Sequence, residues 1–227
     1  MRELESLPLQ EIIAVVSGGS DSGYHTVSGL PNVTVVYHPE PLDAEVGRAI
    51  GAAMTRADML LFVSGDEPIE SHKLAKFLAA VQRGADIALC DRTSALGRFS
   101  EWDNVSRIQS FLNRSLGRAD LGAATMAEVP YAISRRALDA VGIRKLANPP
   151  RAHAAAISGG MKVVLCPGVP VMNRDKLREL AEGPDNPVTI QRIGDYYEAL
   201  REAQDRSGKR LCLVDAVRRR DMLGGVP

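Results

Sequence analysis

The sequence predicts an α/β fold with a mostly parallel sheet flanked by helices. Short β-branched runs alternate with helical patterns over the first two thirds of the 227 residues, as is typical of βαβ units. Three of these runs are almost continuously apolar, which favours strands that are covered on both faces. We expect the strands at residues 11–16, 32–37, 59–63, 86–90 and 162–166.

The segments between these strands show the apolar spacing of helices. One stripe, which predicts a helix over residues 41–57, consists of Leu42, Val46, Ile50 and Met54. Three further helices are expected to start at Ser71, Asp103 and Ser134 and to end near Gly84, Gly117 and Gly142. Beyond several prolines, a C-terminal helix is marked by Ile190, Ile193, Tyr197 and Leu200. We therefore expect a domain over residues 1–182 and a helical appendage over residues 183–227.

Composition and charge exclude several classes of protein. Lys and Arg total 28, as do Asp and Glu, so no net charge attracts nucleic acid. The longest apolar runs, residues 12–16 and 59–63, are far shorter than the roughly 20 residues of a membrane-spanning helix. The N-terminus has no export pattern, so we expect a cytoplasmic protein. Widely spaced cysteines and histidines predict free thiols and no zinc site.

A glycine-rich loop, Ser17–Gly23, follows the first expected strand. Its clustered glycines expose N–H groups that can bind phosphate. The letters SGGSDS resemble the pyrophosphatase loop of ATP-dependent adenylating enzymes, but residues 23–31 lack the apolar stripe of the helix that should follow such a loop. A simple glycine turn between two strands is a further interpretation.

Another resemblance accounts for more of the chain. EIIAVVSGGSDSG is similar to the strand and acidic loop of family-2 glycosyltransferases, and residues 32–53 resemble the strand and helix that follow it. MLLFVSGDEPI resembles the strand that carries the family's D-x-D motif. LAKFLAAVQRGADIALCDR and VPYAISRRALDAVG resemble the next elements in order. This resemblance, which covers residues 7–166, implies a Rossmann-like GT-A nucleotide-diphospho-sugar transferase fold.

The resemblance also implies a binding site. Asp66 matches the last Asp of D-x-D, the ligand of Mn²⁺ or Mg²⁺, whereas Ser64 replaces the first Asp and removes a charge. The family pattern places the glycine-rich loop beside the nucleotide, so Ser17, Gly18 and Asp21 are binding candidates, as is Ser64. Arg48 matches an Arg of the following helix, which pairs either with the diphosphate or with a structural carboxylate.

The catalytic residue stays unknown. The family's Glu-Asp pair, which supplies the base in inverting enzymes, falls on Asn148 and Pro149. Glu67 and His153 are weak substitutes, as are Glu101 and Asp103, and each is also compatible with an ordinary surface or capping position. The family's first strand has no counterpart here, so the fold is expected to be N-terminally short. Two strand edges would then be open, which favours a homodimer.

The sequence thus predicts a transferase that uses a nucleotide-diphosphate sugar and a divalent metal. The acceptor is a glycan, a lipid-linked molecule or a small molecule, and a lipid-linked acceptor would place the protein peripherally at a membrane. Two alternatives stay open. One is a catalytically degenerate relative that serves as a binding or assembly module, and the other is the ATP-dependent adenylating enzyme.

Overall fold

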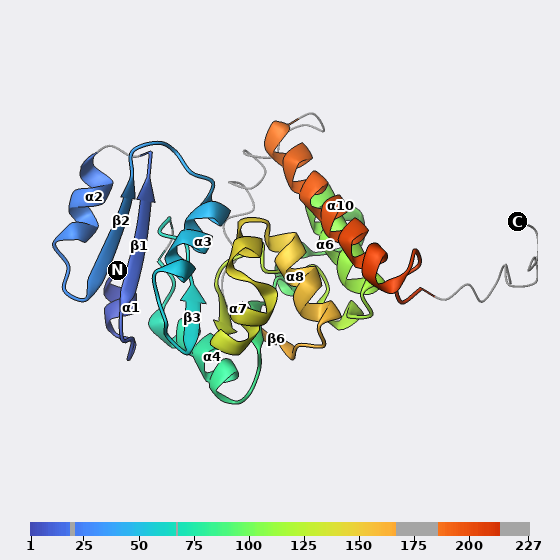
Figure 1. The fold of residues 1–227 in the computed structure, drawn as a ribbon, viewed down its shortest axis with the longest axis horizontal. Coiled ribbons are helices and arrows are strands. Elements are labelled where there is room, and N and C mark those ends of the chain that lie inside the picture. The colour runs from blue at the N-terminus through green and yellow to red at the C-terminus, as the bar shows by residue number, and fades with distance from the viewer. Residues whose placement is uncertain (19–20, 67, 167–185, 214–227) are drawn as a thin grey trace, which may run out of the picture.

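The computed structural model describes residues 1–18, 21–66, 68–166 and 186–213, with only the backbone at 21, 22 and 94 (Figure 1). In the first half of the chain the elements are α1 (Arg2–Glu5), β1 (Ile12–Ser17), α2 (Asp21–Ser28), β2 (Val33–His38), α3 (Ala44–Ala53), β3 (Met59–Phe62), α4 (Ser71–Gln82), β4 (Ile87–Cys90), α5 (Thr93–Leu96), η1 (Phe99–Glu101) and α6 (Asn104–Ser115). They are followed by η2 (Ala119–Leu121), β5 (Tyr131–Ser134), α7 (Arg135–Val141), η3 (Ile143–Ala147), α8 (Pro149–Ser158), β6 (Val163–Cys166) and α10 (Pro187–Ser207).

The strands form two sheets. β1 and β2 pair in parallel as a two-stranded sheet, and a four-stranded sheet has the order β3-β5-β4-β6. Within the larger sheet β5 runs antiparallel to β3 and β4, whereas β4 and β6 are parallel. Three of its four strands therefore share one direction, and the expected mostly parallel α/β fold is confirmed. The antiparallel strand β5 is the exception that the sequence did not indicate.

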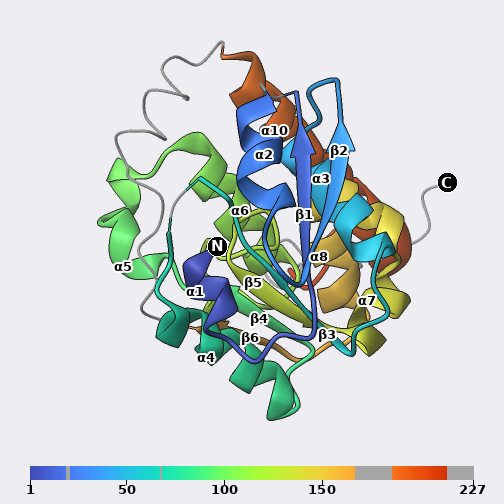
Figure 2. The same ribbon diagram turned by 90° about the vertical axis from the view of Figure 1, so that its left-hand side faces the viewer.

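The larger sheet is covered on both faces because side chains alternate along each strand. Ile87 and Leu89 of β4 point into a core that includes Leu138 of α7 and Ala152 of α8. The intervening residues of β4 pack on the opposite face against α4, in a cluster of Ala88, Cys90, Phe77, Ala80 and Val81. The result is a sheet between two helical layers, as Figure 2 shows.

The smaller sheet is also held between helices. On one face, α3 approaches β1 closely at its glycines: a Cβ added at Gly47 or Gly51 would lie 3.6 or 3.5 Å from the side chain of Val15. On the other face, a Cβ at Gly23 of α2 would lie 3.8 Å from Val16. Larger side chains in these helices would push them away from the strand, so small residues fix the packing distance.

Residues 21–28 are helical, which corrects one expectation. The sequence indicated no helix after the glycine-rich loop, yet α2 spans eight residues there. Its described side chains are exposed apart from a half-buried Val27, so it lacks an apolar stripe and owes its position to contact with β1 and β2. The missing helix therefore no longer counts against a phosphate-binding role of the loop.

Helix α10 packs across α6 and α8 (Figure 1). Its buried residues are Tyr196, Ala199, Leu200 and Ala203. The expected stripe was partly wrong, because Ile190 is 54% and Tyr197 64% exposed. The predicted boundary at residues 182 and 183 lies outside the described residues, so the division of the chain stays a prediction.

Candidate functional site

The carboxyl ends of β3 and β4 lie at one edge of the larger sheet, because both strands run antiparallel to the β5 strand between them. The chain leaves this edge through Ser64 and Asp66 after β3, and through Asp91 and Arg92 after β4. In Figure 1 the arrow of β1 points the same way as that of β3, so the glycine-rich loop leaves its strand on the same side. Open α/β sheets bind ligands at this edge, which is therefore the candidate site.

The turn after β3 presents an oriented carboxylate. The Ser64 hydroxyl donates to Asp66 Oδ2 at 2.9 Å and accepts the Asp66 backbone N–H at 3.2 Å. Asp66 is exposed, and its side chain is held by the turn itself rather than by a buried partner. The replacement of the first D-x-D carboxylate by Ser64 thus leaves a single carboxylate that is aimed by a neutral neighbour.

A divalent cation would fit this turn only if a bound diphosphate supplied further oxygen ligands. No group of three or more His, Cys, Asp or Glu that could hold a metal occurs in the part of the chain that is described. Mg²⁺, however, is commonly bound by one or two carboxylates together with substrate phosphates and water. Asp66 fits the role of such a single protein ligand, with a diphosphate completing the coordination.

The glycine-rich loop is anchored at its first two residues. Ser17 Oγ accepts the Leu42 backbone N–H at 3.2 Å, and the Gly18 N–H donates to His38 O at 3.1 Å. Gly18 has φ +60°, and a Cβ added there would lie 2.6 Å from the Cα of Pro41. Only glycine fits this close approach. The predicted binding residue Asp21 lies at the start of α2, and its side chain is outside the described residues.

Arg48 ties α3 to the segment before β5. Its Nη2 lies 2.8 Å from Glu45 Oε1, and its Nη1 donates to Met126 O and Ala127 O at 3.1 and 3.3 Å. The side chain is only 12% exposed. Of the two roles that the sequence left open, these contacts match pairing with a structural carboxylate.

A buried ion pair at the same edge was missed by the sequence reasoning. Arg92 is 5% exposed, and its Nη1 lies 2.8 Å from Glu128 Oε1. Gln109 Nε2 also donates to Glu128 Oε1, at 3.1 Å. Arg92 Nε is buried and finds no hydrogen-bond partner among the described residues. Arg92 is the last residue of the run GADIALCDR, so the resemblance of this run to the family pattern could have pointed to it. Nothing in the sequence marked Glu128.

Among the candidate bases, His153 is not brought to this edge. His153 is fully buried, and its Nε2 lies 2.7 Å from Asn113 Oδ1. Burial lowers the pKa of His153 to about 3, so it stays neutral in the core. Glu67 lies outside the described residues. Asn148, where the family pair would fall, caps α8 by accepting the Arg151 N–H at 3.3 Å.

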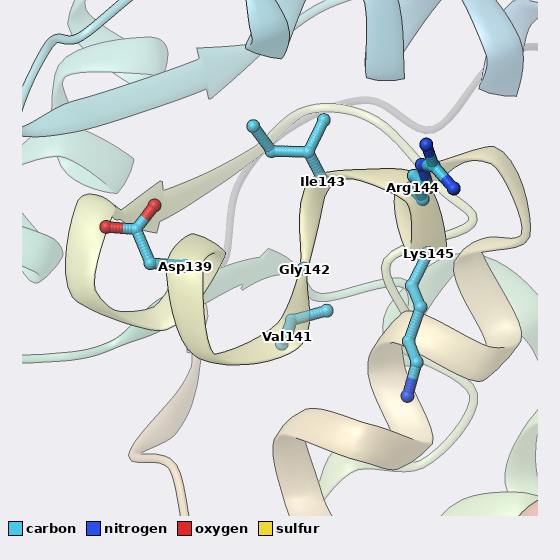
Figure 3. Close-up of a pocket in the computed structure, with 6 residues that line it drawn as sticks. All are labelled: Asp139, Val141, Gly142, Ile143, Arg144 and Lys145. Carbon is cyan, nitrogen blue, oxygen red and sulfur yellow. The ribbon is translucent and has the colours of Figure 1, made fainter.

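A shallow pocket of about 460 Å³ lies elsewhere, at the junction of α7 and η3 (Figure 3). It is lined by Asp139, Val141, Gly142, Ile143, Arg144 and Lys145. Figure 3 shows that the charged side chains diverge rather than converge on one point. None of the predicted site residues lines it, so it does not compete with the sheet edge as the candidate site.

Comparisons with known proteins identify the family of the chain. A sequence model of glycosyl transferase family 2 matches residues 2–142. The chain belongs to this family. A comparison with curated protein sequences gives no significant match.

Solved structures show the same fold. The chain is similar to glucosyl-3-phosphoglycerate synthase from Mycobacterium tuberculosis in complex with phosphoglyceric acid, with 12% identity, a TM-score of 0.54, and coverage of 92% of this chain and 71% of that one. The same enzyme in complex with Mn²⁺, uridine-diphosphate-glucose and glycerol 3-phosphate matches with 15% identity, a TM-score of 0.53 and the same 92% and 71% coverage. At these identities the likeness establishes the GT-A fold and leaves the substrate to be argued separately.

Proposed function

We propose that this family-2 protein is a glycosyltransferase that takes a sugar from a nucleotide-diphosphate sugar with the help of Mn²⁺ or Mg²⁺. The observation that carries the proposal is the exposed, oriented carboxylate of Asp66 at the carboxyl end of β3. Glucosyl-3-phosphoglycerate synthase, which has the same fold, was solved in complex with Mn²⁺ and uridine-diphosphate-glucose, and this supports the choice of donor class.

In this proposal the residues at the edge bind and orient the donor. Asp66 would hold the cation against the diphosphate, where a bound cation neutralises charge that develops on the leaving group. Ser64 keeps the Asp66 carboxylate in place through its hydroxyl. Ser17, Gly18 and Asp21 would shape the nucleotide side of the site. Arg48 would contribute indirectly, by fixing α3 against the chain that enters β5.

Release of nucleoside diphosphate from nucleotide sugars tests the proposal. With Mn²⁺ present, the wild-type protein should release UDP or GDP from at least one sugar of a donor panel. Asp66→Asn should lower this rate by roughly a hundredfold or more, because the charge that holds the cation is removed. Asp58→Asn is the matched control, since Asp58 is an exposed carboxylate before β3, at the other end of the strand. Equal rates for wild type and Asp66→Asn would contradict the metal assignment.

A second candidate is a relative that binds the donor without turnover. It is favoured by Ser64, which leaves one carboxylate in the motif, and by Asn148 and Pro149, which place no carboxylate before α8. Metal-dependent donor binding with no release of nucleoside diphosphate, over a broad panel of acceptors, would support this binding module. The adenylating enzyme is the weaker alternative, since the family match extends far beyond the SGGSDS loop.

We also propose a cytoplasmic homodimer. The N–H groups of Ile12 and Gly18 point towards β2, so those of Ile13 and Val15, one residue out of phase, point to the other edge of β1. Neither this edge nor the outer edge of β3 pairs with a strand among the described residues. A second copy could cover such edges. Of the described helices, none is long and apolar enough to cross a membrane.

A further inference from the structure

The segment from η1 through α6 exposes an aromatic and basic surface that the candidate site does not use. Phe99 is 61% exposed and Phe111 51% exposed. The ring of Trp102 lies 5.2 Å from that of Phe99, and the Arg107 guanidinium lies 5.9 Å from the centre of the Phe99 ring. We define the η1–α6 face as Arg98, Phe99, Trp102, Arg107, Phe111 and Arg114.

This face is continuous. Arg107, Phe111 and Arg114 follow at intervals of four and three residues, so they lie along one side of α6. Arg107 Nη2 donates to Ser100 O at 3.0 Å, which fastens η1 to the same side of the helix. The other side of α6 packs against α10, where Leu112 is fully buried. Phe111 therefore projects from a helix that is packed against α10, and Phe99 projects from η1, which Arg107 fastens to that helix.

Among the described residues, no carboxylate forms an ion pair with the arginines of the face. None of the ion pairs found among the described residues includes Arg98, Arg107 or Arg114. Two exposed carboxylates lie on the same segment and accept backbone N–H groups: Glu101 accepts from Arg98 N at 3.3 Å, and Asp103 from Ser106 N at 2.8 Å. The three arginines therefore leave a small excess of positive charge on this segment. The face thus combines large apolar rings with the exposed guanidinium groups of Arg98 and Arg114, whereas the half-buried guanidinium of Arg107 already donates to Ser100 O.

We propose that the η1–α6 face docks on an anionic membrane surface. Aromatic rings settle at the boundary between headgroups and acyl chains, and Arg side chains pair with anionic headgroups. A folded protein partner would need carboxylates that match three separate arginines, whereas an anionic bilayer offers negative charge at any position. α5 begins at Thr93, directly after the carboxyl end of β4, so docking would hold the candidate site near the lipid surface. The inference does not depend on the proposed sugar transfer.

Vesicle co-sedimentation tests the inference. The wild-type chain should bind vesicles of phosphatidylcholine mixed with phosphatidylglycerol, and should not bind phosphatidylcholine alone. High salt should weaken the binding, because it screens the arginines. The double variant Phe99→Ser/Phe111→Ser should lose roughly tenfold or more in partitioning. Arg107→Gln/Arg114→Gln should lose roughly fivefold for each arginine.

The matched control is Tyr24→Ser/Tyr37→Ser. It removes two exposed rings from α2 and β2, on the opposite side of the molecule from α6 (Figure 1), and should bind vesicles like the wild type. Circular dichroism and thermal melting identify any variant that is not folded, and the arginine variant provides a second test if the phenylalanine variant fails. The inference is overturned if the wild type does not bind anionic vesicles, or if the folded phenylalanine and arginine variants bind them as well as the wild type does. It is also overturned if light scattering shows that the face mediates only self-association.

Discussion

His153 shows how burial makes the stability of the folded protein depend on pH. Asn113 Nδ2 donates to Gly122 O and Ala124 O, so Asn113 Oδ1 must accept, and the proton of neutral His153 lies on Nε2. Its Nδ1 is buried and has no partner among the described residues. Protonation would therefore create a buried charge and an unsatisfied donor, which is why burial lowers the pKa of His153 to about 3.

The low pKa of His153 predicts a loss of stability in mild acid. Between about pH 6.5 and 3 the unfolded chain binds one more proton than the folded chain at this residue, so the free energy of unfolding falls as the pH is lowered. From pH 7 to 5, urea denaturation should show the wild type losing about 2 kcal/mol more than His153→Gln. His72→Gln, at an exposed position, should behave like the wild type. An identical pH dependence in wild type and His153→Gln would contradict this account.

Gly18 is the second residue whose substitution gives a clear expectation. Gly18→Ala should lower the free energy of unfolding by about 1–3 kcal/mol, because its φ is +60° and the new Cβ would overlap the backbone of Pro41. Gly29→Ala is the control, since a Cβ there meets nothing within 4 Å. Chemical denaturation of both variants measures the difference. Equal stability of the two variants would show that the loop can relax.

At the scale of elements, α10 is held by an ion-pair network centred on Glu202. Its carboxylate lies 2.9 Å from Lys145 Nζ, 2.9 Å from Arg151 Nε and 2.6 Å from Arg206 Nη2. The hydrogen bond from Lys145 is the largest of the effects that lower the pKa of Glu202 to about 2. The network joins α10 to η3 and α8, which extends the apolar contact of Tyr196 and Leu200.

Removing the charge of Glu202 should loosen α10. Glu202→Gln should cost about 1 kcal/mol at pH 7, a modest value because the side chain is partly exposed. The folded-state pKa is depressed, so this stabilisation is present above pH 4.5 and is lost as the pH falls towards 2. Denaturation at pH 7 and at pH 3 should therefore show the difference from wild type shrinking. Asp205→Asn, on the same helix, should change little, and a constant difference at both pH values would contradict the account.

The elements also show what the sequence could predict. Apolar β-branched runs located β1, β2, β3, β4 and β6 to within a residue or so, because covered strands must be apolar along their length. β5 was missed because four residues, YAIS, carry no period of their own. α2 was missed for a different reason. It is mostly exposed and therefore has no apolar stripe, and tertiary contact with the strands fixes its position. In the candidate site, the resemblance to the D-x-D motif singled out Asp66. The Arg92–Glu128 pair could not be predicted, because it depends on a contact between distant segments of the chain.

At the scale of the whole molecule, the open edges of β1 and β3 in the two sheets predict self-association. If the open edges of β1 and β3 are covered by a second copy, light scattering should give twice the mass of one chain, falling towards one mass on dilution. The four-stranded sheet alone already has a full core on both faces, so the association should not be needed for its folding. A single-chain mass at every concentration would rule out the homodimer.

Nucleotide binding at the carboxyl edge of the sheets is the property on which the proposed function depends. Thermal melting with UDP, GDP and ATP, each with and without Mn²⁺, tests it most directly, because a ligand at 100 times its dissociation constant stabilises the folded state by about 2.7 kcal/mol. We expect an upward shift with UDP or GDP that requires Mn²⁺ and that disappears in Asp66→Asn. A shift with ATP alone, or no shift with any nucleotide, would contradict the account.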